Sequence, residues 1–325
     1  RCDNVNFRDS KPKPASQRRS GYGHAQKIRA ATTNLFGVKY GLGSMEWHKD
    51  PSTGRFVGNP SISPMVSRYM LGLQRRKAQA GEAPTSARAI TSAVMRKLYR
   101  HNRRDYGALA VSRGKPEVLT NRLLQACYTL AFICLLRFDE VLRIQMQDIT
   151  FNLDGSIELR LPFRKTDQHG GATPFILWPL DSGEAHLCPY RALCEWLDAS
   201  GIKDGFLFPK LTADGLQVKT LLQTAEAFLE YFRNNLLDVG VAYSPYGTHS
   251  FRRGGCQYLV VDRRWNIRRV CEWGGWSTEF THLTIVKYII SFVDEPMSSR
   301  ADFFRPGRHV AKSCRHCGRS CPCNS

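Results

Sequence analysis

The sequence has few acidic residues for its size. It carries 28 Asp and Glu against 47 Lys and Arg in 325 residues, which leaves a formal net charge of +19. This excess is large for a metabolic enzyme and typically indicates a polyanionic partner, either nucleic acid or an anionic membrane surface. With 42% hydrophobic residues, the chain still has enough apolar material for two ordinary domains.

Long apolar runs are missing too. The longest, around "LLQACYTLAFICLL", is too short and too polar to span a bilayer and is typical of a buried helix. There are no internal repeats, no long low-complexity tracts and no visible secretory signal. The sequence opens with Arg1 rather than Met, as a fragment or a trimmed product does. These absences favour nucleic acid over a membrane as the partner.

The cysteines do not predict a disulfide framework. Eleven is an odd number, and the chain is neither short nor secreted in character. A reducing compartment fits better, so the expected location is the nucleus in a eukaryote and otherwise the cytoplasm. Cys127 and Cys134 lie seven residues apart on an apolar helix and are interpreted as buried thiols.

The last cysteines form a separate cluster in "CRHCGRSCPCNS". The C-x-x-C pair is a good metal half-site, and four thiolates could close one structural zinc tetrahedron. The second pair is only one residue apart, and a tail of free thiols is an equal alternative. The candidate ligands are Cys314, Cys317, Cys321 and Cys323.

Four regions follow from the patterning. Residues 1–20 contain almost nothing that could be buried and are predicted to be a disordered basic arm. Residues 21–108 hold three segments with apolar residues three and four apart, which predicts a small helical domain with a one-sided basic face. The aperiodic stretch 105–119 is the expected boundary. Residues 118–300 form the predicted second domain, and residues 301–325 a Cys-rich basic tail.

Within these regions, helix and strand signals predict an α+β protein, mainly α with a small β-sheet. The third N-terminal helix should begin at Thr85 or Ser86. Residues 120–137 are apolar nearly all round, as in a central buried helix. "SIELRLPF" and "ATPFILWPL" flank a turn, which predicts a β-hairpin with Lys165 near its tip. Helices stopped by glycine are expected at 188–201 and 220–240.

The stretch "THSFRRGGCQYL", residues 248–259, crowds cations at the start of a predicted helix. Thr248 is a good N-cap, and His249 and Arg252 would then share one face of the first turn. Two cations near the positive end of a helix dipole are unfavourable by themselves, and a bound anion would relieve the conflict. A solvated basic turn is the alternative interpretation of this stretch alone.

Further blocks occur in a fixed order along the chain. "LLRFDEVLRIQMQDI" holds Arg137 and Glu140, "EWGGWS" holds Trp276, and "THLTIVKYIISF" holds Tyr288. Together with "THSFRRGG", they resemble the tyrosine recombinases of the phage-integrase type over about half of the chain. The N-terminal helices resemble that family's core-binding domain more weakly. The "HSFRRGG" and Trp combination is most similar to that of Crypton-like eukaryotic mobile elements.

The resemblance implies how a scissile phosphate is held. Arg137 and Arg252 would neutralise the pentavalent phosphate as guanidinium forks, and His249 and the indole N–H of Trp276 would donate to its remaining oxygens. Glu140 would orient Arg137 or His249 without touching DNA. Two other interpretations stay open: Arg137 as a helix-end cation paired with Glu140, and Trp276 as a core residue.

The resemblance also implies a nucleophile and an acid. Tyr288 would attack the phosphate, and Lys165 would protonate the departing 5′ oxygen. Lys165 is alternatively an exposed turn residue whose role passes to Arg164. Tyr288 is alternatively a buried aromatic, and Tyr258 also lies close to the His-x-x-Arg block. The extra residues "TEF" make the interval before Tyr288 longer than the family's usual one.

The expected function is therefore cleavage and rejoining of duplex DNA through a 3′-phosphotyrosine intermediate, as in site-specific recombination or integration. No cofactor is expected for catalysis, since the phosphotyrosine conserves the bond energy. The implied assembly is a homotetramer on DNA. A domesticated DNA-binding protein without activity and an enzyme like the type IB topoisomerases are the alternatives.

Overall fold

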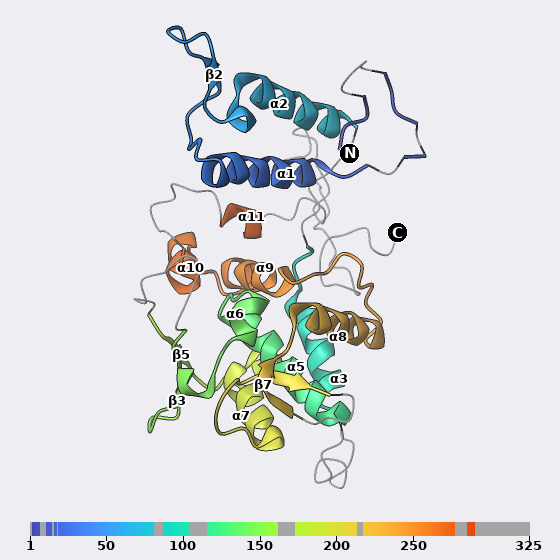
Figure 1. The fold of residues 1–325 in the computed structure, drawn as a ribbon. Helices are drawn as coiled ribbons and strands as arrows, with labels where there is room; N and C mark the ends of the chain where they lie inside the picture. Colours follow the sequence, from blue (N-terminus) through green and yellow to red (C-terminus); the bar gives the residue numbers. More distant parts are fainter. Residues whose placement is uncertain are drawn as a thin grey trace. The chain divides into compact units, whose positions relative to one another are not determined.

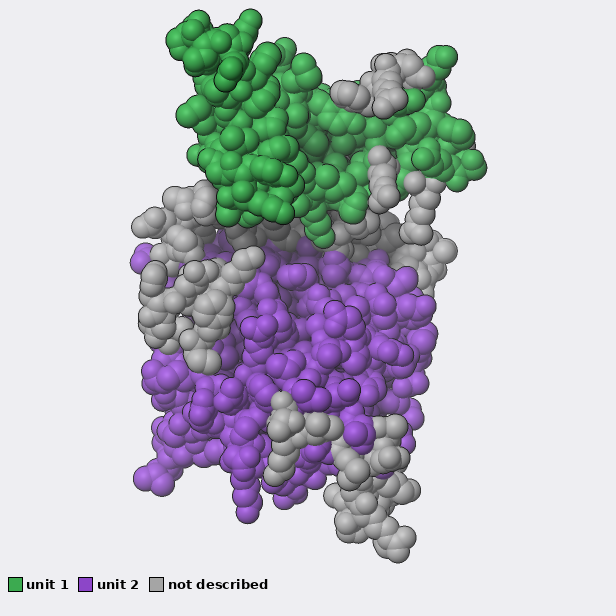
Figure 2. Space-filling view, viewed as in Figure 1, with its two compact units in different colours: residues 1–85 green, residues 86–325 purple. Residues whose placement is uncertain are grey.

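The structure, a computed structural model, divides the chain into two compact units, residues 1–85 and 86–325 (Figure 2). Helices dominate, and the sheets are small and antiparallel, so the expected α+β class is confirmed. Among the described helices, none is both long and apolar enough to cross a bilayer. The described residues are 2–6, 11–14, 16–17, 19–80, 87–104, 116–161, 173–212, 217–276 and 285–289.

Unit 1 is built from two helices and a short hairpin. Two of the three helical segments predicted within residues 21–108 are present in this unit (Figure 1). The second begins where Ser63 accepts a hydrogen bond from the Val66 N–H, and Pro64 occupies its first turn. The elements are α1 (Tyr22–Asn34), the π-helical η1 (Leu35–Lys39), β1 (His48–Lys49), β2 (Phe56–Val57), the 3-10 turn η2 (Pro60–Ile62) and α2 (Pro64–Gln79).

The N-terminal segment lies against α2, which its composition did not predict. Cys2 and Asp3 are buried, and the Asp3 carboxylate accepts hydrogen bonds from the Tyr69 hydroxyl at 3.0 Å and from Arg76 Nε at 3.3 Å. Burial alone raises the pKa of Asp3, but the hydrogen bonds from Arg76 and Tyr69 hold it below its usual value. Lys77 is buried and donates to the Ser20 carbonyl. Part of the predicted basic face of α2 is therefore directed at the chain itself.

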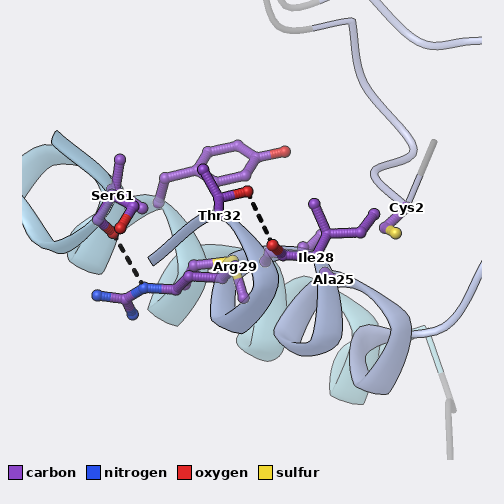
Figure 3. A pocket seen from close by; sticks show the side chains of 10 residues that line it. Cys2, Ala25, Ile28, Arg29, Thr32 and Ser61 are labelled. Carbon is purple, nitrogen blue, oxygen red and sulfur yellow. Dashed lines mark hydrogen bonds between the residues drawn. The ribbon is translucent and has the colours of Figure 1, made fainter. Parts of the chain in front are cut away.

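A cavity of about 300 Å³ lies among the N-terminal segment, α1 and α2 (Figure 3). Its walls are mostly apolar, with Ile28 and Tyr69 among them. Arg29 also lines it, but its guanidinium donates to the Ser61 carbonyl at 3.2 Å and to Ser67 Oγ at 2.8 Å. These bonds join α1 to the start of α2, so the Arg29 cation serves the unit's own packing.

Unit 2 is organised around one central helix, α5, which is buried on nearly every side and contacts α3, α7 and α9 (Figure 1). The sequence predicted this helix at 120–137. The elements of the unit are α3 (Ser92–Asn102), α5 (Pro116–Ile133), α6 (Phe138–Leu142), η3 (Met146–Asp148), β3 (Ile149–Phe151), β4 (Ile157–Leu159), β5 (Phe175–Leu177), η4 (Ser182–Leu187), α7 (Pro189–Ser200), β6 (Pro209–Leu211), β7 (Gln217–Leu222), α8 (Ala225–Asp238), α9 (Ser250–Gln257), η5 (Tyr258–Asp262), α10 (Ile267–Gly274) and α11 (Val286–Ile289).

Helix α3 belongs to unit 2, whereas the sequence assigned it to the N-terminal domain. The helix does not begin at Thr85 or Ser86. Residues 87–90 are not helical, and Thr91 caps α3 by accepting from the Val94 N–H. The apolar face of α3 packs on α5. Its apolar periodicity correctly predicts an amphipathic helix but does not indicate which hydrophobic core the helix packs against.

A buried polar network fixes α3 to its neighbours. Asn102 Nδ2 donates to Gln125 Oε1 on α5 at 3.2 Å. Asn235 Nδ2 on α8 donates to Asn102 Oδ1 at 3.0 Å and to the Tyr128 hydroxyl at 3.1 Å. Because buried amides are costly unless hydrogen-bonded, these bonds specify how the three helices dock.

The expected hairpin is present as β4 and β5, which pair Ile157 with Leu177 and Leu159 with Phe175. Strand β3 extends it to three strands, which was not predicted. Lys165 and Arg164 fall in 162–172, outside the described residues, as do the four tail cysteines. A second correction concerns 220–240, where the first residues belong to strand β7 and helix α8 begins only after its N-cap Thr224.

Candidate functional site

Helix α9 begins one residue later than predicted. Thr248 does not cap it; His249 occupies the N-cap position without a side-chain cap, and the helix runs from Ser250. The Ser250 hydroxyl accepts from the Gly247 N–H at 2.9 Å and closes the preceding turn. Arg252 therefore lies in the first turn of α9, with His249 at its entrance.

The glycine pair of "RRGG" lets α9 pack directly on its neighbours. A Cβ on Gly255 would overlap the Phe132 carbonyl on α5, and one on Gly254 would overlap the Ile90 carbonyl. The helix can approach so closely only because both side chains are absent. The glycine pair is visible in the sequence, but the reason for it is a tertiary contact. This contact places Arg252 in the core.

Arg137 lies at the end of the turn that connects α5 to α6. Leu135, fully buried, adopts a left-handed φ of 52°, which is uncommon for a residue with a branched side chain. Arg137 then forms the N-cap of α6, and Glu140 accepts from its backbone N–H and from its Nη1, both at 2.8 Å. The interpretation of Arg137 as a helix-end cation paired with Glu140 thus describes a real contact, which also fixes its guanidinium.

Glu140 joins the two candidate phosphate-binding arginines. Its Oε2 lies 3.4 Å from Arg252 Nη1, while its Oε1 holds Arg137. The Arg252 side chain is only 1% exposed, and burial lowers its pKa from the usual value. The contact with Arg137 was expected, whereas the contact with Arg252 was not. One carboxylate therefore balances two cations in a largely buried place.

Two aromatic residues complete the cluster around Arg252. Its Cζ lies 4.4 Å from the ring centroid of Trp276 and 5.3 Å from that of Tyr288. The Trp276 and Tyr288 centroids are 5.4 Å apart, and the His249 ring is 6.4 Å from the Tyr288 ring. Five of the six residues picked from the sequence for catalysis, Arg137 among them, are therefore grouped around Glu140 and Arg252.

Two donors in this cluster are buried without an acceptor among the described residues, Arg252 Nε and Trp276 Nε1. Such groups are costly, and in native structures they are normally satisfied by protein, water or a ligand. Trp276 is largely buried, as the core interpretation expects, and Gly274 leaves room for its ring. Helix α10 ends at Gly274, and its C-cap Gly275 has a left-handed φ of 65°. The arrangement suits an anion with several acceptor oxygens.

The surroundings of His249 favour the neutral form of its imidazole. Its burial lowers the pKa, and the neighbouring cations of Arg137 and Arg252 lower it further, against a smaller opposing effect of Asp139. A neutral imidazole has one N–H to donate and one nitrogen to accept. The ring can therefore still donate a hydrogen bond to an anion without adding a third charge to the cluster.

Tyr258, the other tyrosine considered, is engaged elsewhere. Its hydroxyl donates to Glu184 Oε1 at 2.8 Å, and Arg263 holds the second oxygen of the same carboxylate at 2.6 Å. Burial and the bond to Glu184 raise the pKa of Tyr258 to about 12. Its phenol is therefore poorly suited to act as a nucleophile, and Tyr288 is the tyrosine that faces Arg252.

The sequence matches no protein-family model and no curated protein. Solved structures that are similar to it include two of the XerH site-specific recombinase bound to difH substrate. The pre-cleavage complex has a TM-score of 0.40 and 15% identity over 64% of this chain and 49% of that one. The post-cleavage complex, on palindromic difH, has a TM-score of 0.49 and 14% identity over 83% and 62%. This chain spans less than two thirds of those recombinase chains, and a likeness this distant carries no argument about function.

Proposed function

We propose that this chain breaks and rejoins duplex DNA through a transient covalent bond between Tyr288 and a 3′ phosphate. The observation that carries the proposal is the grouping of Arg137, His249, Arg252 and Trp276 beside Tyr288, with two buried donors left for an anion. The net charge of +19 supports a polyanionic substrate.

In this proposal the phosphate takes the place between the two arginines and the indole N–H. The Tyr288 oxygen attacks phosphorus, the bond to the 5′ oxygen breaks, and the phenol proton is lost while the 5′ oxygen gains one. Arg252 and Arg137 stabilise the added negative charge of the pentavalent state, which guanidinium forks match well.

Glu140 has a positioning role in this scheme. It holds both guanidinium groups by hydrogen bonds and keeps them from repelling each other while the site is empty of DNA. Lys165 remains the predicted acid for the 5′ oxygen. The reverse attack of a 5′ hydroxyl on the phosphotyrosine reseals the strand, so the reaction as proposed consumes no ATP.

The expected assembly, substrate type, cellular location and zinc binding belong to the same proposal. Recombination between two sites needs four strand cuts, and a homotetramer supplies four copies of Tyr288. A mobile-element substrate of the Crypton type, a nuclear location and a zinc-binding Cys tail stay predictions. DNA affinity should fall steeply with salt, because each neutralised phosphate releases counterions.

The test is covalent trapping. The full chain is incubated with a pool of nicked, randomised duplexes in EDTA without ATP, denatured, and analysed by gel and peptide mass. We expect a DNA adduct on the peptide that contains Tyr288. Tyr288→Phe should abolish it while leaving salt-sensitive DNA binding within about twofold, because only the attacking oxygen is removed.

Tyr258→Phe is the matched control, since it removes another phenol of the same unit that contacts Glu184 instead of Arg252. It should leave the adduct yield unchanged. An adduct that survives Tyr288→Phe and disappears in Tyr258→Phe would overturn the assignment of the nucleophile. Salt-sensitive binding without any adduct would favour the non-catalytic DNA-binding protein, and relaxation of plasmid without preferred sequence would favour a topoisomerase-like enzyme.

A further inference from the structure

Gln257 connects the two helices that bear the central residues of the cluster. It is the last residue of α9, five residues after Arg252. Its side-chain Nε2 donates to the Ile289 carbonyl at 2.9 Å and lies 3.5 Å from the Tyr288 carbonyl. The backbone of the tyrosine segment is thus tied to the helix that carries the arginine (Figure 1).

This tie matters because the described part of α11 is short. Val286–Ile289 is a single turn, and one turn has little stability of its own. Its placement depends on tertiary contacts, among them those of the buried Ile285 and the tilted ring contact between Tyr288 and Trp276. These apolar contacts hold the turn in place but do not fix its position along α9. A directional hydrogen bond at a specific carbonyl does.

We propose that Gln257 is a positioning residue that sets the distance between the Tyr288 phenol and Arg252. The inference rests on the proposed function, since it concerns the same reaction. Gln257 does not touch the phosphate in this scheme. It acts through the backbone of α11, so its loss should slow the chemical step and leave DNA affinity in place.

The chemistry of the contact explains the residue type. Both partners are carbonyl oxygens, which need a donor, and the glutamine amide supplies one without adding a charge beside Arg252. Gln257→Glu keeps the length but presents a carboxylate to the carbonyls. Gln257→Leu keeps a similar volume and removes the donor. Both variants should therefore fail in the same direction, with the Glu variant the worse.

A matched control exists within unit 2. Gln217 also donates its side-chain Nε2 to a backbone carbonyl, that of Ser200, at 2.7 Å. It lies on β7, and its bond joins β7 to the end of α7, neither of which carries a residue of the cluster. Gln217→Leu therefore removes the same kind of hydrogen bond from the same unit without touching α9 or α11.

The first measurement is the single-turnover rate of adduct formation on a nicked duplex that wild type cleaves, with the DNA Kd determined separately. We expect Gln257→Leu to lower the rate about tenfold, since misplacement of a reacting group by a fraction of an ångström has effects of this order. The Kd should stay within about twofold, and Gln217→Leu should change neither. An unchanged rate in Gln257→Leu, or a lower rate accompanied by a matching rise in Kd, would overturn the proposal.

The second measurement is hydrogen exchange of the peptide that spans 285–289, in the full chain without DNA. Gln257→Leu should speed exchange there about threefold or more, whereas Gln217→Leu should leave it unchanged. If wild type forms no adduct on any duplex, the proposed function fails, and exchange alone decides whether Gln257 holds α11. Unchanged exchange at 285–289 would then overturn the positioning role as well.

Discussion

Unit 1 and unit 2 are both rich in cations but use them differently. In unit 1, Arg29 donates to Ser61 and Ser67, and Arg76 pairs with Asp3 while 40% of its side chain remains exposed. In unit 2, Arg252 is almost completely buried, and its Nε has no acceptor among the described residues. Positive charge is therefore no guide to a site by itself. What sets Arg252 apart from Arg29 and Arg76 is the nearly complete burial of its side chain together with an Nε that has no acceptor among the described residues.

The cores of the two units account for this difference. Unit 1 has a small cluster of buried apolar residues, with Leu73 its most buried member. In unit 2, one large apolar cluster includes residues from Ile90 to Ile285 in the sequence. Removing a guanidinium from water is costly, and a larger apolar core supplies more folding free energy against that cost. A site with a buried arginine is accordingly expected in unit 2 and not in unit 1.

The largest expected effect comes from adding one methyl group to a glycine. Gly255→Ala should destabilise unit 2 by about 4 kcal/mol, because its Cβ would overlap the Phe132 carbonyl on α5. The same change in unit 1, Gly23→Ala, meets nothing within 4 Å on helix α1 and should stabilise by about 0.5 kcal/mol. Denaturant unfolding measures both. Equal effects would show that the close approach of α9 is not required.

A second comparison removes one carboxylate charge from each unit. Glu140→Gln should cost about 3 kcal/mol, because it leaves two cations facing an amide in a buried place. Asp3→Asn should cost about 1 kcal/mol, since its partner Arg76 is partly solvated. Hydrogen exchange resolved by peptide reads the two units separately. A larger loss in Asp3→Asn would reverse the comparison.

The smallest of the three effects is a pH dependence confined to unit 2. Burial, with the nearby Arg96, lowers the pKa of His186 to about 4. The unfolded state then binds more protons, so stability is fully present above pH 6.5 and is lost as the pH falls toward 4. From pH 7 to pH 5 this amounts to about 2 kcal/mol.

His186→Gln should weaken that dependence, because the amide does not titrate and still reaches toward Ser92, the present partner of the ring. His249 shifts in the same direction, so only the difference between wild type and variant reports His186. Denaturant unfolding followed by tryptophan fluorescence, at pH 7 and pH 5, measures it. An identical slope in both proteins would remove His186 as the cause.

Local patterns were predicted well from the sequence. The apolar helix around Cys127, the hairpin of β4 and β5, and the glycine stop of α7 at Gly201 follow from periodicity and turn chemistry. The order of the blocks around Arg137 and Tyr288 also selected residues that the fold brings together. Each of these predictions depends on residues close together in the sequence or on the chemistry of the side chains. A single sequence contains both kinds of information.

The failures share a different cause. Thr248 is a residue type that caps helices well, but His249 occupies the N-cap position of α9. The close packing of α9 on its neighbours sets where this helix begins. Helix α3 has the periodicity of any amphipathic helix, and the buried Asn102 network decides that it joins unit 2. Residues 220–222 suit a helix by propensity but pair as strand β7. In each, contacts distant in sequence override the local preference.

The sequence by itself determined which side chains are available for the chemistry, the strong positive charge and most of the elements that carry them. Only the tertiary structure decided that Glu140 holds both arginines, that Arg252 loses its contact with water, and that Tyr258 is committed to Glu184. The physical reason is that burial and pairing depend on which surfaces meet. A periodic pattern identifies the apolar face of a helix or strand. Tertiary packing decides which neighbouring element that face contacts.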